Sequence, residues 1–324
     1  MNFKFFEQLS LRNKLFLAFV VVVLIPLTLY SIFLYMITVF GLTYIENFQM
    51  QKGLNSTLRI IESKGRTLLR ETVDYGNWHE MWSWIKTRDP EWLRINVIDW
   101  VPQNFNVQLI AITDLKGKVL YQYGDFPEYQ GLIADNPLVK EGLKFKEVFG
   151  IIKTSRGLAL IAASPIHDST VTPKLPQNGV LLYGQLIDQK FMNNLKELTG
   201  NEITIFEKDI PVASTKGQLA PRIPSKIWQT VSFEGEVYID RSLREVMAVY
   251  GPLKDLEGST IGLVEVVTPR EAVLGTRGNI RNAAIILIFL GLLLAVGLVY
   301  LLRGLIIEPI LKLEKAIETL KARK

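Results

Sequence analysis

Two long uncharged runs near the ends of the chain constrain its fold more than any other feature. They cover residues 15–45 and 282–302, and 236 residues of mixed polarity lie between them. A bilayer core of about 30 Å is crossed by about 20 apolar helical residues, so each run is long enough to span a membrane. The sequence therefore predicts a protein that crosses a membrane twice and carries a large segment on one side.

The short segments that flank these runs carry the whole net positive charge. Residues 1–14 have a net charge of +2 and residues 303–324 a net charge of +3, which together equal the +5 of the chain. Short cytoplasmic segments are enriched in Lys and Arg, so we expect both termini in the cytoplasm and the central segment outside. Arg270, Arg277 and Arg281 oppose this orientation, but long segments cross the membrane largely regardless of their charge.

The first run is predicted to be an uncleaved anchor. It is about twice as long as the apolar region of a signal peptide, and no small-x-small cleavage site follows it. The chain contains no Cys, which excludes disulfides, a thiolate nucleophile and Cys-ligated metal. The external segment is therefore expected to be stabilised by packed apolar cores, and its length suffices for one or two of them.

A helical stripe follows the first span. Apolar or small residues recur at intervals of three and four, at Ile61, Gly65, Leu68, Thr72, Tyr75, Trp78 and Trp82. No Pro interrupts residues 27–89, so the sequence predicts one long helix that rises from the membrane and ends near Asp89 and Pro90. A short helix is expected at residues 91–100.

Short apolar runs separated by turn residues come next and predict antiparallel strands. The expected strands cover residues 107–113, 118–123, 146–152, 158–165, 179–187, 202–206, 210–214, 245–251 and 260–268, with a short one at Tyr238. A helix at residues 189–198 separates the first five from the rest and ends at Gly200. Residues 162–188 and 249–267 share the order strand, Pro, Asp, turn and Gly-containing strand, which predicts two modules of one fold.

The apolar pattern continues beyond the second span with the spacing of a coiled-coil seam. The seam consists of Ile306, Ile310, Leu313, Ile317 and Leu320. With Pro309 within it, the segment 303–324 resembles the first helix of a HAMP signal relay, and we expect it to form a parallel homodimer. The alternative is an amphipathic tail on anionic lipid, to which Lys312, Lys315 and Lys321 are suited. Because no output domain follows, the chain is expected to be part of a longer receptor or a truncated form.

The external segment also resembles a known family. Asp74-Tyr-Gly-Asn-Trp-His-Glu-Met-Trp-Ser-Trp-Ile85, followed by Asp114-Leu-Lys-Gly117, is similar to the fourth subclass of CHASE sensor domains, which typically begin with Asp-aromatic-x-x-Trp on a helix. The family usually has a carboxylate one residue after that Trp, where this chain has His79. The order of elements over roughly residues 45–270 resembles the double Cache, or PAS-like, extracytoplasmic sensors.

The resemblance and the residue patterns together imply an α+β fold. It has two tandem PAS/Cache-like antiparallel-sheet modules on a long N-terminal helix, flanked by two transmembrane helices and a coiled-coil stub. The expected divisions are a cytoplasmic N-terminus (1–14), a first transmembrane helix (15–42), the long helix with the membrane-distal module (43–200), the membrane-proximal module (201–281), a second transmembrane helix (282–302) and the truncated first HAMP helix (303–324).

Candidate ligand-binding residues gather around the aromatic stretch, because ligand sites are mostly apolar with a few placed polar groups. They are Asp74, Tyr75, Trp78, His79, Trp82, Asp168 and Tyr183. Helical spacing predicts that Asp74, Trp78 and Trp82 face the first sheet together. The alternative is that the two Trp rings only pack the helix on that sheet, with Asp168 a turn carboxylate and Tyr183 a strand aromatic.

No catalytic motif supports an enzyme. The chain has two His and lacks nucleophile-elbow, P-loop, dinucleotide-binding and zincin motifs, and His79 and Glu80 are adjacent, so their side chains diverge on a helix. We therefore expect no catalytic residue, no metal and no cofactor in this chain. Nucleic-acid binding is excluded because the central segment is neutral.

The sequence thus predicts the sensory input and transmembrane relay of a homodimeric receptor in the cell (inner) membrane. The missing output would be a histidine kinase, a cyclic-dinucleotide enzyme or a chemotaxis signalling rod. Expected partners are an unidentified small molecule or periplasmic protein, a second copy of the chain and membrane lipid. The alternatives are a membrane-tethered adaptor that binds another protein, which an exposed apolar patch in place of a closed cavity would indicate, and a membrane-anchored hydrolase.

Overall fold

The computed structural model describes residues 13–14, 17–18, 21–22, 25–168, 170, 176–217, 221–243 and 245–321. The predicted N-terminal segment 1–14 and the first ten residues of the predicted span 15–42 lie mostly outside these residues. The chain divides into two units. The terminal unit comprises the residues up to Glu46 and from Arg270 onward, and the central unit comprises Asn47–Pro269.

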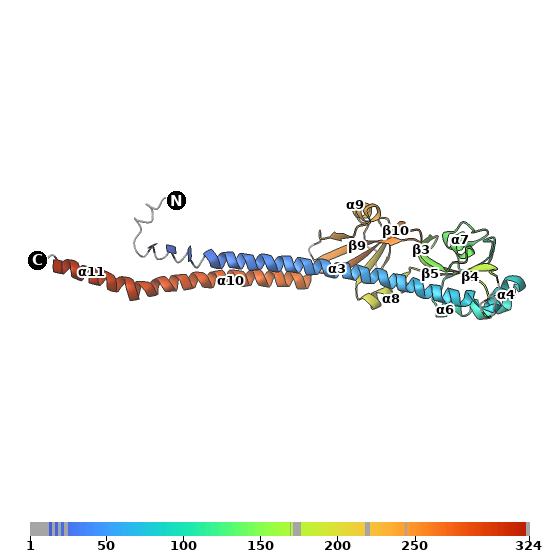
Figure 1. Ribbon diagram of the computed structural model, residues 1–324, viewed down its shortest axis with the longest axis horizontal. Helices are drawn as coiled ribbons and strands as arrows, with labels where there is room; N and C mark the ends of the chain where they lie inside the picture. Colours follow the sequence, from blue (N-terminus) through green and yellow to red (C-terminus); the bar gives the residue numbers. More distant parts are fainter. Residues whose placement is uncertain are drawn as a thin grey trace. The chain divides into compact units, whose positions relative to one another are not determined.

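The terminal unit consists of helices. They are the first part of α3 (Ile25–Gly76), then α10 (Glu271–Leu302), a π-helical turn η5 (Arg303–Ile307) and α11 (Glu308–Lys321) (Figure 1). Two helical segments, Ile25–Gly76 and Val273–Ile310, are long and apolar enough to cross a membrane. Most of the large apolar side chains described along them are exposed, as expected of surfaces that face lipid.

An ion cluster joins α3 to α10 beside the apolar stretches. The Glu46 side chain is only 5% exposed, and it accepts hydrogen bonds from Arg270 Nε at 2.9 Å and Arg277 Nη2 at 3.1 Å. Arg277 also donates to Thr43 Oγ1 at 2.9 Å. Two of the three arginines that opposed the predicted orientation are therefore paired with a carboxylate of the same unit.

The first sheet of the central unit is antiparallel. Its strands are β1 (Leu109–Asp114), β2 (Val119–Tyr123), β3 (Val148–Thr154), β4 (Gly157–Ile166) and β5 (Gly179–Leu186), in the order β2-β1-β5-β4-β3. Before it lie the helices α4 (His79–Thr87), α5 (Pro90–Leu93), η2 (Arg94–Ile98) and α6 (Val101–Asn104). The short helices η3 (Pro127–Tyr129) and α7 (Pro137–Leu143) lie between β2 and β3.

The second sheet is also antiparallel, and its strand order is that of the first sheet with every strand number raised by five. Its strands are β6 (Glu202–Glu207), β7 (Ile210–Ser214), β8 (Tyr238–Asp240), β9 (Val246–Lys254) and β10 (Thr260–Pro269), in the order β7-β6-β10-β9-β8. Its helices are α8 (Gln189–Thr199), α9 (Ser225–Gln229) and η4 (Thr230–Glu234). The predicted fold class, two antiparallel modules of one fold on a long helix, is confirmed.

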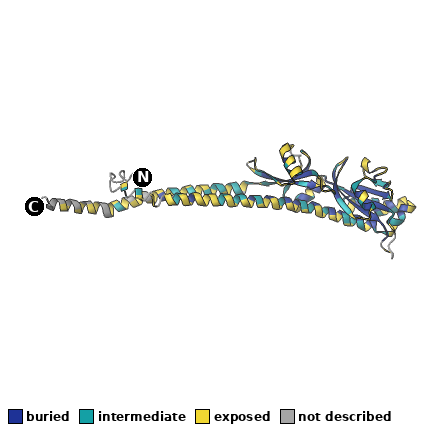
Figure 2. Cartoon of the chain, turned by 45° about the horizontal axis from the view of Figure 1, so that its top comes forward, coloured by how far each residue is buried: buried dark blue, intermediate teal, exposed yellow. Residues whose placement is uncertain are grey.

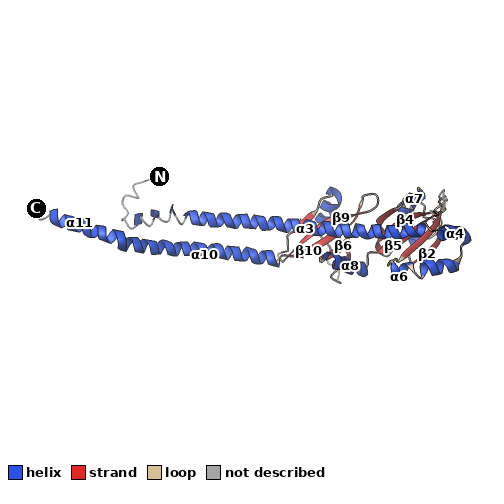
Figure 3. Cartoon of the chain, turned by 60° about the horizontal axis from the view of Figure 1, so that its bottom comes forward, coloured by secondary structure: helices blue, strands red, loops and turns tan. Residues whose placement is uncertain are grey.

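The second half of α3 packs against both sheets (Figure 3). Met50, Leu54, Ile61, Leu68 and Tyr75 are buried in one core cluster with residues of both sheets and of α8. Their spacing of four and seven places them on one face of the helix. Buried residues gather in the two sheets, whereas α10 is exposed along most of its length (Figure 2).

The predicted continuation of the long helix to Asp89 is wrong, because α3 ends at Gly76. A Cβ on Gly76 would lie 2.6 Å from Ser164 Oγ and 3.0 Å from the Pro165 carbonyl oxygen, so the helix end touches the backbone of β4. The Gly76 carbonyl accepts a hydrogen bond from the backbone N–H of His167. The chain then turns, and α4 starts in a new direction after Trp78, whose backbone is extended (ψ 136°).

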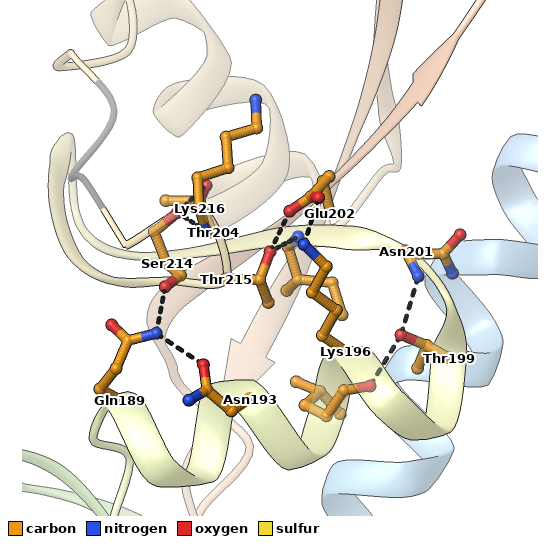
Figure 4. A network of polar contacts seen from close by, with 12 residues as sticks. Gln189, Asn193, Lys196, Thr199, Asn201, Glu202, Thr204, Ser214, Thr215 and Lys216 are labelled. Atoms are coloured by element: carbon orange, nitrogen blue, oxygen red, sulfur yellow. Dashed lines mark hydrogen bonds and ion pairs between the residues drawn. The ribbon is translucent and has the colours of Figure 1, made fainter.

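Helix α8 is bonded to the second sheet (Figure 4). Lys196 Nζ donates to Glu202 Oε1 at 2.5 Å, and Gln189 Nε2 donates to the Ser214 carbonyl oxygen at 3.1 Å. Gly200 follows the helix with φ 68°, so the predicted glycine stop is confirmed. The expected division between residues 200 and 201 separates the two sheets, whereas these contacts connect α8 with β6 and β7.

Two further contacts link the modules. Leu256, in the turn between β9 and β10, packs against the apolar cluster on the outer face of the first sheet. A Cβ on Gly150 in β3 would lie 3.3 Å from Leu256 Cβ, so this glycine allows the approach. Lys153 of β3 also forms an ion pair with Glu207 of β6.

Truncation of Leu54 should destabilise the central unit strongly. Its side chain is fully buried in the core cluster, and removal of a buried Leu costs about 2–5 kcal/mol. The neighbouring Asn55 is exposed, so Asn55→Ala should change the free energy of unfolding by no more than about 0.5 kcal/mol. Urea denaturation of residues 47–269 expressed alone, followed by Trp fluorescence, measures both. Equal stabilities of the two variants would contradict the assigned packing.

Candidate functional site

The candidates predicted from the sequence separate into a polar group and an aromatic group. Asp168 follows β4 and its side chain is fully buried. Its Oδ1 accepts hydrogen bonds from Oγ1 and from the backbone N–H of Thr170, at 2.6 and 2.8 Å. Its Oδ2 lies 2.7 Å from Nδ1 of His79. These hydrogen bonds lower the pKa of Asp168 to about 2, and the bond from Thr170 has the largest effect, followed by the one from His79.

His79 begins α4, and 54% of its side chain is exposed. Its ring stacks on Trp82 one turn later, with centroids 6.2 Å apart and planes at 27°. Trp82 Nε1 donates to the Pro176 carbonyl oxygen at 2.9 Å, and its own carbonyl oxygen accepts from Asn178 Nδ2 at 2.6 Å. The polar group thus connects α4 with the residues after β4 and before β5.

The aromatic group lies where α3 ends on the first sheet. Tyr75 stacks on Trp78 with centroids 4.3 Å apart, and it meets Tyr183 edge-on at 5.8 Å and Phe105 at 6.0 Å. Tyr183 is fully buried on the central strand β5, and this burial raises its pKa well above the ordinary value. Burial also raises the pKa of Tyr75. This geometry fits the alternative in which Trp78 packs on the sheet and Tyr183 is a strand aromatic, and Tyr75 packs between them.

The expectation that Asp74, Trp78 and Trp82 face the first sheet together is wrong. Asp74 is exposed near the end of α3, whereas Trp82 belongs to α4. The break after Gly76 removes the helical spacing on which that expectation rested. Asp74 therefore belongs to neither group.

Three members of the polar group are not among the residues predicted from the sequence, and they are Thr170, Pro176 and Asn178. Thr170 lies two positions after Asp168, a spacing at which Asp side chains commonly accept bonds from the following backbone. That local pattern is a usable signal in the sequence. The contacts of Pro176 and Asn178 with Trp82 span 94 and 96 positions, and local spacing carries no information about them.

The outer face of the first sheet, opposite α3, is filled with side chains. Leu109, Ala111, Phe126, Tyr129 and Leu138 form a buried cluster there with residues of β4 and β5. Burial raises the pKa of Tyr129 to about 12, although its hydroxyl accepts a hydrogen bond from Asn136 Nδ2 at 3.4 Å. Within the described ranges, no three His, Asp or Glu side chains are grouped so as to hold a metal ion.

Asp168→Asn should destabilise the protein at neutral pH, because an amide cannot match the charge-assisted hydrogen bonds from Thr170 and His79. The folded pKa of about 2 is below the ordinary 3.8, so the carboxylate contributes stability above pH 4 and loses it as the pH falls towards 2. The difference in melting temperature between wild type and variant should shrink over that range. A difference that stays constant from pH 7 to pH 2 would contradict the assigned bonds.

Comparison with known domain families matches two overlapping regions. Residues 60–206 match the CHASE4 domain, and residues 185–280 match single cache domain 3. The first region contains α4, the first sheet and α8, and the second contains α8 and the second sheet. No curated protein sequence matches the chain.

Three solved structures are similar to this chain at low sequence identity. The periplasmic domain of LuxQ from Vibrio cholerae is 11% identical with a TM-score of 0.49, and the match covers 68% of this chain and 99% of that one. An extracellular ligand binding receptor from Desulfohalobium retbaense is 13% identical with a TM-score of 0.43, over 68% of this chain and 40% of that one. The sensor domain of the histidine kinase DctB from V. cholerae is 9% identical with a TM-score of 0.41, over 71% and 97%.

The two domain matches meet over α8, the helix that connects the sheets. The resemblance to CHASE-type and Cache sensor domains that the sequence predicted is thereby confirmed.

Proposed function

We propose that this chain is the extracytoplasmic sensor and transmembrane relay of a signalling receptor. The observation that carries the proposal is the way in which the central unit is connected. Helix α3 contains both an apolar stretch long enough to cross a membrane and the stripe that packs on the sheets. At the other end, β10 stops at Pro269 and α10 begins at Glu271. Both ends of the sensor region therefore lead directly into candidate membrane helices.

The domain matches support sensing by the central unit, because CHASE4 and cache domains are sensor domains. We assign the central unit to the outside of the cell (inner) membrane and both termini to the cytoplasm, as the charge distribution of the sequence favours. The output that this relay controls would be a histidine kinase, a cyclic-dinucleotide enzyme or a chemotaxis signalling rod. The chain itself would take no part in catalysis.

The Glu46 cluster is suited to couple the two membrane helices. The Glu46 carboxylate is 5% exposed, and it is bonded to Arg277 of α10 and to Arg270, the residue before α10. It therefore holds α3 and α10 in register. Loss of one partner of such a buried pair leaves an uncompensated charge, which is strongly unfavourable. A shift of α3 would therefore be transmitted to α10.

The stub after the second span would carry the signal onward as a parallel homodimer. Ile310, Leu313 and Ile317 of α11 are 50%, 64% and 54% exposed, so the described residues give them little apolar cover. Their spacing, with Ile306 and Leu320 at either end, is that of a coiled-coil seam. A second copy of the chain would bury this seam, and a HAMP-type relay works in such a dimer.

Ligand contact in the membrane-distal module would involve the polar group. His79 and Trp82 are accessible on α4, and Asp168 fixes the position of the His79 ring. A small molecule or a periplasmic protein that contacts these rings would act on α4 directly and on the end of α3 through Gly76. Tyr75, Trp78 and Tyr183 would serve to pack α3 on the sheet.

The proposed orientation predicts which positions react from outside the cell. Because the chain has no Cys, single cysteines give an unambiguous signal. Glu257→Cys, in the exposed turn before β10, should react with a membrane-impermeant maleimide on intact cells. Lys312→Cys on α11 should react only after the membrane is permeabilised. Labelling of Lys312→Cys in intact cells would exclude a cytoplasmic C-terminus.

The proposed dimer predicts a seam-specific cross-link. Ile310→Cys, at a seam position, should form a disulfide-linked dimer in membranes at least several-fold faster than Lys312→Cys, which lies off the seam. Copper phenanthroline oxidation followed by non-reducing electrophoresis measures the two rates. Equal rates at the two positions would mean that α11 pairs through another face or lies on the lipid surface.

A further inference from the structure

A cavity of about 240 Å³ lies on the outer face of the second sheet. Along β10 the side chains alternate: Val264 and Val266 join the core beneath α3, whereas Leu263 and Glu265 point to the opposite face. The cavity lies on that opposite face. Its walls include Phe206, Ala248, Tyr250 and Glu265 from the sheet, and Ile223 from the segment before α9.

Glu265 is an unusual residue for this position. It lies on the central strand, between Thr204 of β6 and Tyr250 of β9, and only 8% of it is exposed. Tyr250 donates its hydroxyl proton to Glu265 Oε1 at 2.6 Å. Burial raises the pKa of Tyr250, and so does the neighbouring charge of Glu265. The hydroxyl therefore remains a neutral donor at physiological pH.

The Glu265 carboxylate has no cationic partner among the described residues. Glu265 takes part in none of the ion pairs formed by the described residues. No Lys, Arg or His nitrogen among them therefore lies within 4.0 Å of its carboxylate oxygens. Lys216, Arg222 and Asp240 also line the cavity. Lys216 and Arg222 are exposed, Arg222 Nη1 lies 3.6 Å from Asp209 Oδ2, and Asp240 adds a second carboxylate to the walls. A buried carboxylate is costly without a cation nearby, and one neutral hydroxyl offsets that cost only in part.

We propose that the cavity binds a small organic ammonium compound. Its N–H groups would donate to the Glu265 carboxylate, and its carbon atoms would lie against Phe206 and Ala248. The volume is below the roughly 300 Å³ of drug-sized sites and corresponds to about eight water molecules, so the ligand has few non-hydrogen atoms. A divalent metal is a poorer occupant because it requires several oxygen ligands, and the described residues hold no group of three acidic or His side chains that could bind it.

This inference rests on the proposed sensor function and names a ligand class for the membrane-proximal module. Glu265 lies five residues before Arg270, which contacts Glu46. An ammonium ligand would therefore bind on the strand that leads directly into the ion cluster and α10. Binding at Glu265 and transmission to α11 are nevertheless separate events, and they can be measured separately.

The test uses the full chain in detergent, with thermal unfolding followed by Trp fluorescence and affinity measured by calorimetry. The probes are propylamine, putrescine and L-alanine, and propanol, propionate and MgCl₂ serve as non-ammonium controls. At least one ammonium probe should raise the melting temperature, and the controls should not.

Glu265→Gln should weaken that binding by roughly 10- to 100-fold, because it removes the charge-assisted hydrogen bond. Glu236→Gln, an exposed carboxylate of the same module, should bind like wild type.

A second measurement needs no ligand. Gln keeps the shape and can still accept the Tyr250 bond, and it removes a buried charge that one hydroxyl offsets only in part. Unliganded Glu265→Gln should therefore melt at the same temperature as wild type or higher. A lower melting temperature would show that Glu265 is already compensated, and this would overturn the proposal. Failure of all three ammonium probes, equal binding by Glu265→Gln, or stabilisation by MgCl₂ would also overturn it. If the amines bind but leave the Ile310→Cys cross-linking rate unchanged, the site stands and the relay function fails.

Discussion

The apolar stripe on the second half of α3 is the contact on which the rest of the central unit depends. Helix α3 covers the inner face of each sheet with one row of side chains, and separate apolar clusters cover the outer faces. Leu54 lies against Gly251 of β9, and Gly65 lies against Phe149 of β3. One helix thus serves two sheets, because glycines at both places permit close approach. Without this helix the inner face of each sheet would lose the row of apolar side chains that packs along it.

The strands could be predicted because their signals are local. Alternation and turn residues are readable within a few positions, and Gly200 marks a helix end that needs a left-handed backbone. The end of α3 could not be predicted, because the contact that stops it is with Ser164 and Pro165, nearly 90 positions away. The same holds for the candidate site: His79 and Asp168 are separated by 89 positions, and only the bond from Thr170 to Asp168 has a local pattern.

The basic residues near the second span show how pairing changes the meaning of a charge count. Counted along the chain, Arg270, Arg277 and Arg281 weaken the argument for an external central segment. In the structure, Arg270 and Arg277 share the Glu46 carboxylate. Glu46 is 224 positions from Arg270, so the compensation is visible only in three dimensions. The local net charge of this cluster is then +1, which is a weak signal beside the net charge of +3 on residues 303–324.

The position of Leu256 has a consequence for how the protein folds. Its side chain belongs by sequence to the second sheet but completes the outer apolar cluster of the first. Unfolding of the second sheet would withdraw it and open that cluster to water, and α3 would at the same time lose its contacts with that sheet. Regions that share buried side chains in this way open together rather than in turn. We therefore expect the two modules, although each repeats the other's topology, to open as one cooperative unit, so that the best-protected amide protons in both sheets report the same free energy of opening.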